Sequence, residues 1–159
     1  LLWFESGEVE YRFSLGEIDP VQVEWLEISM ELSSNAPMYR ENFKSDIYVG
    51  LGETELGVWT SPGDYGARRG RFNPSWWSDT SSQYGLLKTW RVDNQGCTLD
   101  GEPLSSVTLA DLNLGGQDYL ALRIGVHADA AHVGGINLFG EQFGDFAQGI
   151  VVRVGYAKP

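Results

Sequence analysis

Cysteine, positive charge and long apolar runs are all scarce in this chain of 159 residues. The single cysteine, Cys97, excludes an internal disulfide and a zinc site built from cysteines, and we interpret it as a structural thiol. With 11 basic residues against 22 acidic ones, the net charge of -11 argues against general binding to nucleic acid or to an anionic membrane. The apolar runs are only a few residues long, whereas a transmembrane helix needs about 18.

The common catalytic and nucleotide-binding signatures are also missing. The chain has no Gly-x-Ser-x-Gly, His-Glu-x-x-His, Gly-x-Gly-x-x-Gly or phosphate-loop pattern, and no Asp-x-Asp-x-Asp-Gly calcium loop. His127 and His132 flank Asp129, but two histidines do not supply the three or four ligands of a metal site. Most carboxylates fall on the expected solvent faces of strands, as Glu27 and Glu31 do. We therefore predict a non-catalytic chain without a metal or cofactor.

The composition is that of a folded β-rich domain. A hydrophobic content of 42% and an aromatic content of 13% predict a packed core, and 20 glycines with 6 prolines predict many turns. The length predicts one domain spanning residues 1–159. Because the chain begins Leu1-Leu2-Trp3, without an initiator methionine or a signal-peptide pattern, we interpret it as a segment of a longer polypeptide.

Period-two alternation of apolar and polar residues dominates the chain. Asp100-Gly101 is a two-residue hairpin turn, residues 93–96 form another turn, and residues 106–114 allow one helical turn capped by Ser106 or Thr108. About eight to ten strands without a sizeable helix predict an all-β fold, a two-sheet antiparallel β-sandwich with jelly-roll-like connectivity. The clearest strands are residues 8–13, 26–32, 47–51, 86–92, 120–126 and 150–156.

Three irregular stretches are longer than ordinary connections, namely residues 33–44, 61–83 and 127–148. Long loops on a β-sandwich commonly carry recognition, because the sheets supply a rigid base. Within the third stretch, residues 134–146 combine glycines with three phenylalanines, which we interpret as a turning loop with apolar anchors.

Residues 59–77 gather three tryptophans and three arginines among turn residues. Sugars present C–H faces that lie on aromatic rings and hydroxyls that charged or amide side chains bind, so this composition favours a sugar ligand. Adjacent Trp76 and Trp77 point in opposite directions if extended, so we expect one to be buried and the other exposed. The alternative is that the tryptophans close the end of the sandwich and the arginines pair with surface acids. The candidate ligand-binding residues are Asp64, Tyr65, Arg69, Trp76, Trp77, Gln83, Tyr84, Trp90 and Asn137.

Several longer motifs together resemble the C-terminal, ligand-sensing domain of bacterial ArsR-like winged-helix transcriptional regulators. The resemblance covers nearly the whole chain. The motifs are Ser45-Asp46-Ile47, residues 59–66 (WTSPGDYG), Arg69-Gly70, residues 74–77 (PSWW), residues 83–90 (QYGLLKTW), residues 132–140 (HVGGINLFG) and Phe143-Gly144-Asp145.

The resemblance implies a cytoplasmic regulator in which a separate N-terminal winged helix binds DNA while this domain binds a small-molecule or oligosaccharide effector. Metal sensing through thiolate clusters is not implied, because the chain has a single cysteine. Two other functions stay open. One is a carbohydrate-binding module or a small glycan-active enzyme domain, and the other is a structural domain that forms a homodimer through its aromatic loops.

Overall fold

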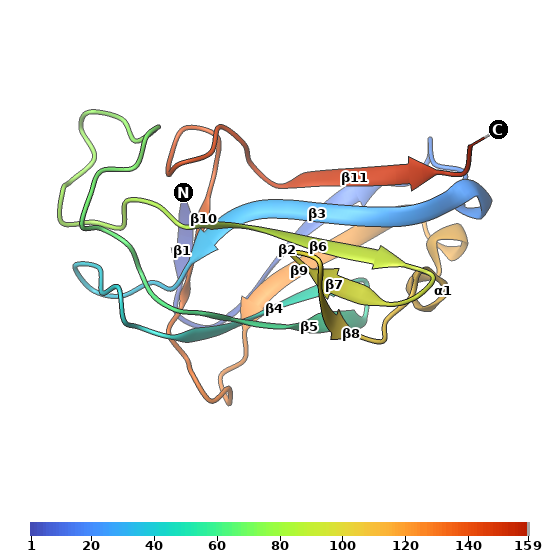
Figure 1. Ribbon diagram of the computed structural model, residues 1–159, viewed down its shortest axis with the longest axis horizontal. Coiled ribbons are helices and arrows are strands. Elements are labelled where there is room, and N and C mark those ends of the chain that lie inside the picture. Colours follow the sequence, from blue (N-terminus) through green and yellow to red (C-terminus); the bar gives the residue numbers. More distant parts are fainter. Residues whose placement is uncertain (159) are drawn as a thin grey trace.

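Two antiparallel β-sheets packed face to face form the protein, as the computed structural model shows for residues 1–158 (Figure 1). Alternating apolar residues from both sheets meet in the space between them. The prediction of an all-β sandwich is confirmed. The seven-stranded sheet contains β1 (Leu2–Phe4), β10 (Ile136–Phe139), β3 (Val23–Ser33), β6 (Leu86–Asp93), β7 (Cys97–Leu99) and β8 (Glu102–Ser105) in this order, with β11 (Val151–Tyr156) also paired to β3. The four-stranded sheet is ordered β2 (Gly7–Ser14), β9 (Tyr119–Val126), β4 (Ser45–Leu51) and β5 (Thr54–Ser61).

The connectivity is that of a jelly roll with two additions. Strands β10 and β11 pair with successive parts of the same edge of β3, Glu31–Ser33 and Val23–Ser29, so they act as one strand interrupted by residues 140–150. The β7–β8 hairpin extends the sheet beyond β6. With that hairpin set aside, the chain passes from one sheet to the other at every step except the β4–β5 hairpin and the β10–β11 edge, as in a jelly roll. The interruption in the β10–β11 edge sends a long loop toward one end of the molecule.

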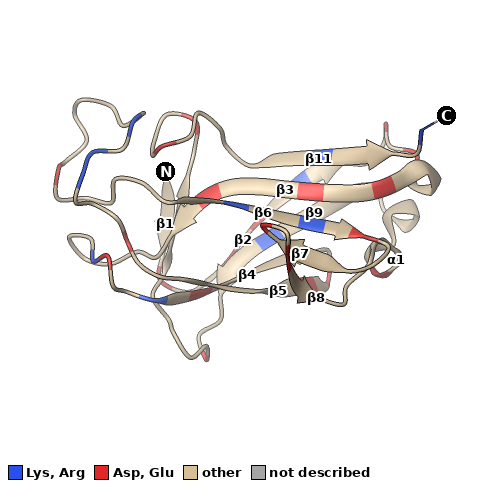
Figure 2. Cartoon of the chain, in the orientation of Figure 1, with Lys and Arg blue, Asp and Glu red and all other residues tan. Residues whose placement is uncertain are grey.

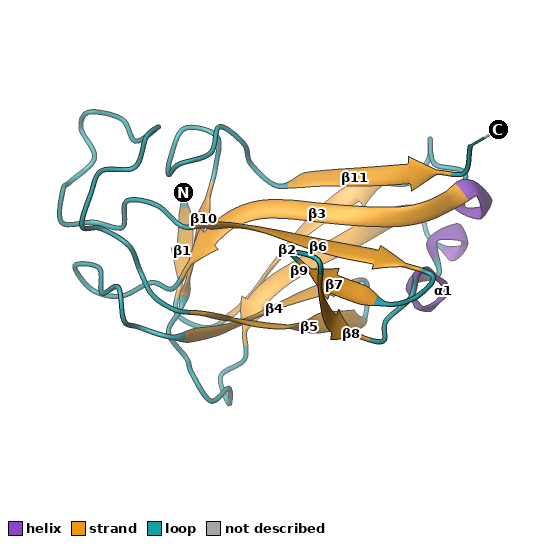
Figure 3. Ribbon diagram, viewed as in Figure 1, coloured by secondary structure: helices purple, strands orange, loops and turns teal. Residues whose placement is uncertain are grey.

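Helical structure is limited to short turns in the described part of the chain (Figure 3). They are η1 (Pro20–Gln22), α1 (Leu109–Leu112) and η2 (Leu114–Gly116). Thr108 precedes α1, and its backbone N–H donates to Asp111 Oδ2 at 2.8 Å, as a helix N-terminus requires. None of these helices is long and apolar enough to cross a membrane.

Strand β10 corrects the prediction that residues 127–148 form one continuous loop. All four of its residues are buried, so the sequence shows no alternation there, and the neighbouring glycines favoured a loop interpretation. Strands β1 and β5 are also additions to the predicted set. The Asp100-Gly101 turn is confirmed, because both residues have positive φ, 50° and 85°, as a two-residue hairpin turn requires.

The long loops gather at one end of the sandwich, opposite α1 (Figure 1). Specific hydrogen bonds join them: Ser34 N–H donates to Gly63 O at 3.1 Å, and Phe72 N–H donates to Gly144 O at 2.9 Å. Positive charge gathers in the loop before β6, which holds Arg68, Arg69 and Arg71, whereas acidic residues are spread over both sheets (Figure 2). The tertiary structure thus brings together three segments that are far apart in the sequence.

Candidate functional site

A groove of about 300 Å³ opens at the loop end of the sandwich. Trp3 from β1, Met38 from the loop after β3 and Trp77 from the loop before β6 contribute its apolar walls, and none of its lining side chains is an Asp, Glu, Lys or Arg. Its volume is at the lower end of the range for small-ligand pockets, about 300–1,000 Å³. The remaining lining residues are Leu1, Asn35, Ala36, Thr80, Ser81, Ser82 and Asn137.

Asn137 forms the floor of the groove. It lies between Trp3 and Ser33 in the register of three neighbouring strands, so the three side chains share one face of the sheet. Its Nδ2 donates to Ser34 O at 2.8 Å and to Ser82 Oγ at 2.9 Å. Asn137 is only 2% exposed where it lines the groove, and its Oδ1 accepts no hydrogen bond from residues 1–158, so this oxygen keeps its acceptor capacity.

Asp64 lies beneath this floor and does not line the groove. The residue has 0% exposure, and its Oδ2 accepts hydrogen bonds from Ala36 N at 2.9 Å and from Ser82 Oγ at 2.8 Å. Burial raises the pKa of the carboxyl, and these hydrogen bonds oppose that rise. Its Oδ1 is buried without a partner among the described residues. Asp64 therefore positions two groove residues rather than contacting a ligand.

The two adjacent tryptophans are divided between surface and interior, as the sequence predicts. Trp76 is 74% exposed, whereas Trp77 is half-buried and its Nε1–H donates to Ser82 O at 2.9 Å. Phe143 packs edge-on against both rings, with centroid distances of 6.1 and 5.1 Å. Only Trp77 lines the groove, and Trp76 extends the aromatic surface beside it.

Arg69 and Gln83 shape the loop before β6 from within. Arg69 Nη1 donates to Asp79 Oδ1 at 2.9 Å and to Trp77 O at 3.1 Å. Gln83 is 1% exposed, and its Nε2 donates to the carbonyls of Ser78 and Ser81. Because most of their donors are directed at groups of the loop itself, these side chains hold the loop in shape; Gln83 is buried, whereas the Arg69 side chain is 37% exposed.

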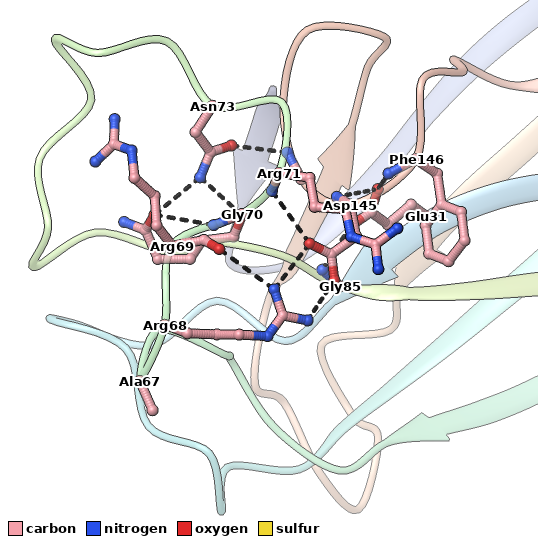
Figure 4. Close-up of polar contacts among 12 residues, drawn as sticks. Glu31, Ala67, Arg68, Arg69, Gly70, Arg71, Asn73, Gly85, Asp145 and Phe146 are labelled. Carbon is pink, nitrogen blue, oxygen red and sulfur yellow. Dashed lines mark hydrogen bonds and ion pairs between the residues drawn. The ribbon is translucent and has the colours of Figure 1, made fainter.

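Tyr65 and Tyr84 form a separate aromatic cluster outside the groove. Their rings stack with a centroid distance of 5.3 Å, and the Arg68 guanidinium lies 3.8 Å from the Tyr84 ring centroid. Arg68 also forms a bidentate ion pair with Asp145, at 3.0 and 2.6 Å, which joins the two long loops (Figure 4). This pair lowers the pKa of Asp145. The cluster therefore connects loops, and its guanidinium group, that of Arg68, is already paired with Asp145.

Glu31 corrects the prediction of a solvent-facing carboxylate in β3. The residue has 0% exposure, because the loop of residues 140–150 folds over it. Its carboxylate accepts hydrogen bonds from the backbone N–H groups of Gly85, Asp145 and Phe146, at 2.9 to 3.1 Å (Figure 4). Burial raises the pKa of Glu31, and these three donors oppose the rise. Glu31 thereby fixes the loop that brings Phe143 against the tryptophans.

Trp90 has 0% exposure and packs in the core between the sheets, so it has no surface to offer a ligand in this structure. Its position in β6 directs it inward, together with Val92. Sequence reasoning missed Trp3, Met38 and Ser82. Trp3 lies in a strand of three residues, too short to show a period, and Met38 and Ser82 belong to loops without a pattern.

The histidines and the cysteine lie outside the groove. His127 stacks on Tyr48 with ring centroids 4.0 Å apart, and His132 Nδ1 lies 3.3 Å from the Asp46 carboxylate. No group of three or more metal-ligating side chains is found within residues 1–158. Cys97 is buried, and burial raises its pKa to about 11, so it is a thiol at neutral pH.

Comparison of the chain with protein-family models, with curated proteins and with solved structures gives no significant match. The resemblance to ArsR-like regulators therefore depends on the sequence motifs alone. The groove, its uncharged lining and the aromatic surface beside it are the features on which a function can be based.

Proposed function

We propose that this chain is a non-catalytic effector-binding domain whose groove binds a neutral sugar or the sugar part of a glycoside. The observation that carries the proposal is the combination of two tryptophan walls, Trp3 and Trp77, with Asn137, whose Oδ1 accepts no hydrogen bond within residues 1–158, in a lining without charged side chains. Aromatic walls suit the C–H face of a pyranose, and an amide oxygen accepts a hydrogen bond from a sugar hydroxyl.

The lining also argues for a neutral ligand over a charged one. No acidic or basic side chain lines the groove, so a carboxylate, phosphate or ammonium group would lose hydration without gaining a charged side chain as partner. Ser82 is held by Asp64, and Asn137 is held by Ser34 and Ser82, so the polar groups are in place before a ligand arrives. Such preorganisation reduces the entropy cost of binding.

The motif resemblance supports placing this domain in a cytoplasmic transcriptional regulator. The net charge of -11 supports assigning the DNA contacts to a separate winged-helix domain. The coding sequence upstream of residue 1 tests this part of the proposal. A winged helix there supports a regulator, whereas a secretion signal with a glycan-degrading domain contradicts it and favours a carbohydrate-binding module.

Titration of tryptophan fluorescence with neutral mono- and oligosaccharides tests the groove. Trp3→Ala removes one wall and is expected to weaken binding about tenfold or more. Trp76→Ala is the matched control, because Trp76 is also exposed but does not line the groove. Equal effects of the two substitutions, or no response of the wild-type protein to any sugar of the panel, would contradict the proposal.

Self-association through the same end of the molecule is a second candidate function. Trp3, Met38 and Trp76 are 57%, 74% and 74% exposed, a concentration of apolar surface that also occurs at protein interfaces. Sedimentation velocity distinguishes the two functions. A dimer that Met38→Ser and Trp76→Ser dissociate supports an interface, whereas a monomer at every concentration supports the ligand groove alone.

A further inference from the structure

A second cavity, of about 720 Å³, lies on the outer face of the four-stranded sheet near α1. Helix α1 lies at the end of the sandwich opposite the long loops (Figure 1). Strands β2 and β9, the turn between β4 and β5, and the segment from α1 to Gln117 all contribute to it. None of its residues is among the candidate ligand-binding residues predicted from the sequence. The lining residues are Glu10, Arg12, Leu51, Gly52, Glu53, Thr54, Asp111, Leu112, Asn113, Gln117, Tyr119 and Arg123.

Small residues on the central strands explain why the sheet is hollow at this place. Glu10, Arg123 and Gly50 are opposite one another across β2, β9 and β4, so their side-chain positions share the outer face. A Cβ at Gly50 would lie 2.6 Å from Arg123 Nη2, so the missing side chain is what lets the guanidinium lie flat in the hollow. Ala121, which lies opposite Arg12 in the next pair of residues along β2 and β9, has a small side chain and also leaves space above the sheet.

Both arginines of the cavity pair with carboxylates, the Arg123 side chain being 20% exposed and the Arg12 side chain 62% exposed. Arg123 Nε donates to Gly52 O at 2.6 Å and Nη1 donates to Glu8 at 3.3 Å, while Nη2 has no hydrogen-bond partner within residues 1–158. Arg12 Nε donates to Glu10 at 2.7 Å, and its guanidinium lies 4.4 Å from the Tyr119 ring centroid. Guanidinium groups whose orientation is fixed by carboxylates present unused N–H donors in a defined plane.

Hydrogen-bond acceptors also line the cavity, beside the N–H donors of the two arginines. Gln117 Nε2 donates to Leu112 O at 2.7 Å, which leaves its Oε1 free to face the cavity, and Glu53 makes no side-chain hydrogen bond within the described residues. Three carboxylates and two guanidinium groups line the cavity, so its field does not favour an anion, and the arginines oppose a cation. A neutral molecule with many hydroxyl groups, which both donate and accept, matches this lining.

We propose that this outer-face cavity is a second binding site, for a neutral oligosaccharide, independent of the tryptophan-walled groove. No tryptophan lines the cavity, in contrast to the groove, so binding here is not expected to change the fluorescence of a lining tryptophan. This difference allows each site to be followed by its own signal.

The test is nuclear magnetic resonance of the labelled protein during titration with cellohexaose, xylohexaose and mannohexaose. Binding is expected to shift the Arg123 Nε–H and Gln117 side-chain amide signals. Arg123→Met removes the donors and keeps the alkyl chain, so we expect affinity to fall about tenfold or more. Arg153→Met is the matched control, because Arg153 is exposed on β11 in the other sheet.

A second variant, Glu53→Ala, tests the site in case Arg123→Met fails to fold. Glu53 is exposed in a turn, and Glu53→Ala is expected to weaken binding about threefold or more without altering the spectrum elsewhere. Shifts that persist in Trp3→Ala separate this site from the groove. The proposal is overturned if none of the three hexasaccharides moves the two signals, if Arg153→Met weakens binding as much as Arg123→Met, or if an acidic oligosaccharide binds more tightly than the neutral ones.

Discussion

Ser82 Oγ donates a hydrogen bond of 2.8 Å to Asp64 Oδ2, beneath the floor of the tryptophan-walled groove. Through this contact a carboxylate that a ligand does not reach fixes a hydroxyl group that lines the groove. The same Ser82 Oγ accepts from Asn137 Nδ2, so one buried carboxylate orders two polar groups of the floor. This relationship makes Asp64 a positioning residue and leads to the first prediction.

Asp64→Ala leaves Ala36 N–H and Ser82 Oγ–H without their acceptor. We expect the free energy of unfolding to fall by about 2–3 kcal/mol and sugar affinity to fall with it, because buried donors without partners are costly. Urea denaturation measures the first effect and fluorescence titration the second. Asp129→Ala, an exposed site, is the control and is expected to change stability by less than about 0.5 kcal/mol. Unchanged stability of Asp64→Ala would show that the network contributes nothing.

The buried carboxyl of Glu31 is expected to make the free energy of unfolding depend on pH. Its pKa is raised in the folded state, chiefly by burial, so the ionised form is disfavoured on folding. Its contribution to stability is therefore fully present below the unfolded pKa and is lost as pH rises through the folded pKa. Glu31→Gln removes this titration, so the stability of the variant relative to the wild type is expected to decline as pH falls from neutral toward about 4.

Urea denaturation of both proteins over that pH range checks this prediction. Glu27→Gln, on the same strand but paired with Arg91 at the surface, controls for the loss of a carboxylate as such. If the curves of Glu31→Gln and the wild type run parallel at every pH, the buried carboxylate does not titrate as its environment implies.

Packing of the loop of residues 140–150 over Glu31 requires a glycine at position 144. A Cβ at this position would clash with the Glu31 carboxylate, and the residue has a positive φ of 78°. Gly144→Ala is therefore expected to lower the free energy of unfolding by about 1–3 kcal/mol. Gly140→Ala is the matched control in the same loop, because a Cβ there meets no atom within 4 Å. Thermal unfolding of the two variants tests this prediction. A Gly144→Ala variant as stable as Gly140→Ala would contradict it.

The two adjacent tryptophans are expected to differ in stability effect. Trp77→Ala removes the hydrogen bond to Ser82 O and the edge-on contact with Phe143, and we expect it to cost about 2 kcal/mol. Trp76→Ala, at a residue 74% exposed, is expected to cost less than about 0.5 kcal/mol. Chemical denaturation of both variants tests the difference, and similar costs would mean that the division between interior and surface is wrong.

Much of the fold could be predicted because alternation is a local property. In β2 and β9, apolar residues at every second position indicate which face of the strand is buried. Strand β10 could not be predicted in this way, because a strand buried on both faces shows no alternation. The single helical turn capped near Thr108 was predictable from its local sequence.

The candidate site was predictable in composition but not in arrangement. The sequence indicates that aromatic and polar loop residues carry recognition, and Trp77 and Asn137 do line the groove. It does not indicate that Arg69, Gln83 and Asp64 direct their polar groups at the loops themselves, or that Trp3 completes the wall. Those outcomes depend on which backbone groups come within hydrogen-bonding distance.

The amino-acid sequence by itself therefore determined most of the strands, the hairpin turn and the division of Trp76 from Trp77, since each depends on residues near one another in the chain, and its composition determined the acidic charge. Only the tertiary structure decided that Glu31 is buried, that Asp64 lies under the groove floor, and that small residues hollow the outer face of the four-stranded sheet. The physical reason is that burial and hydrogen-bond partners are set by segments distant in sequence, such as the loop of residues 140–150 that covers Glu31.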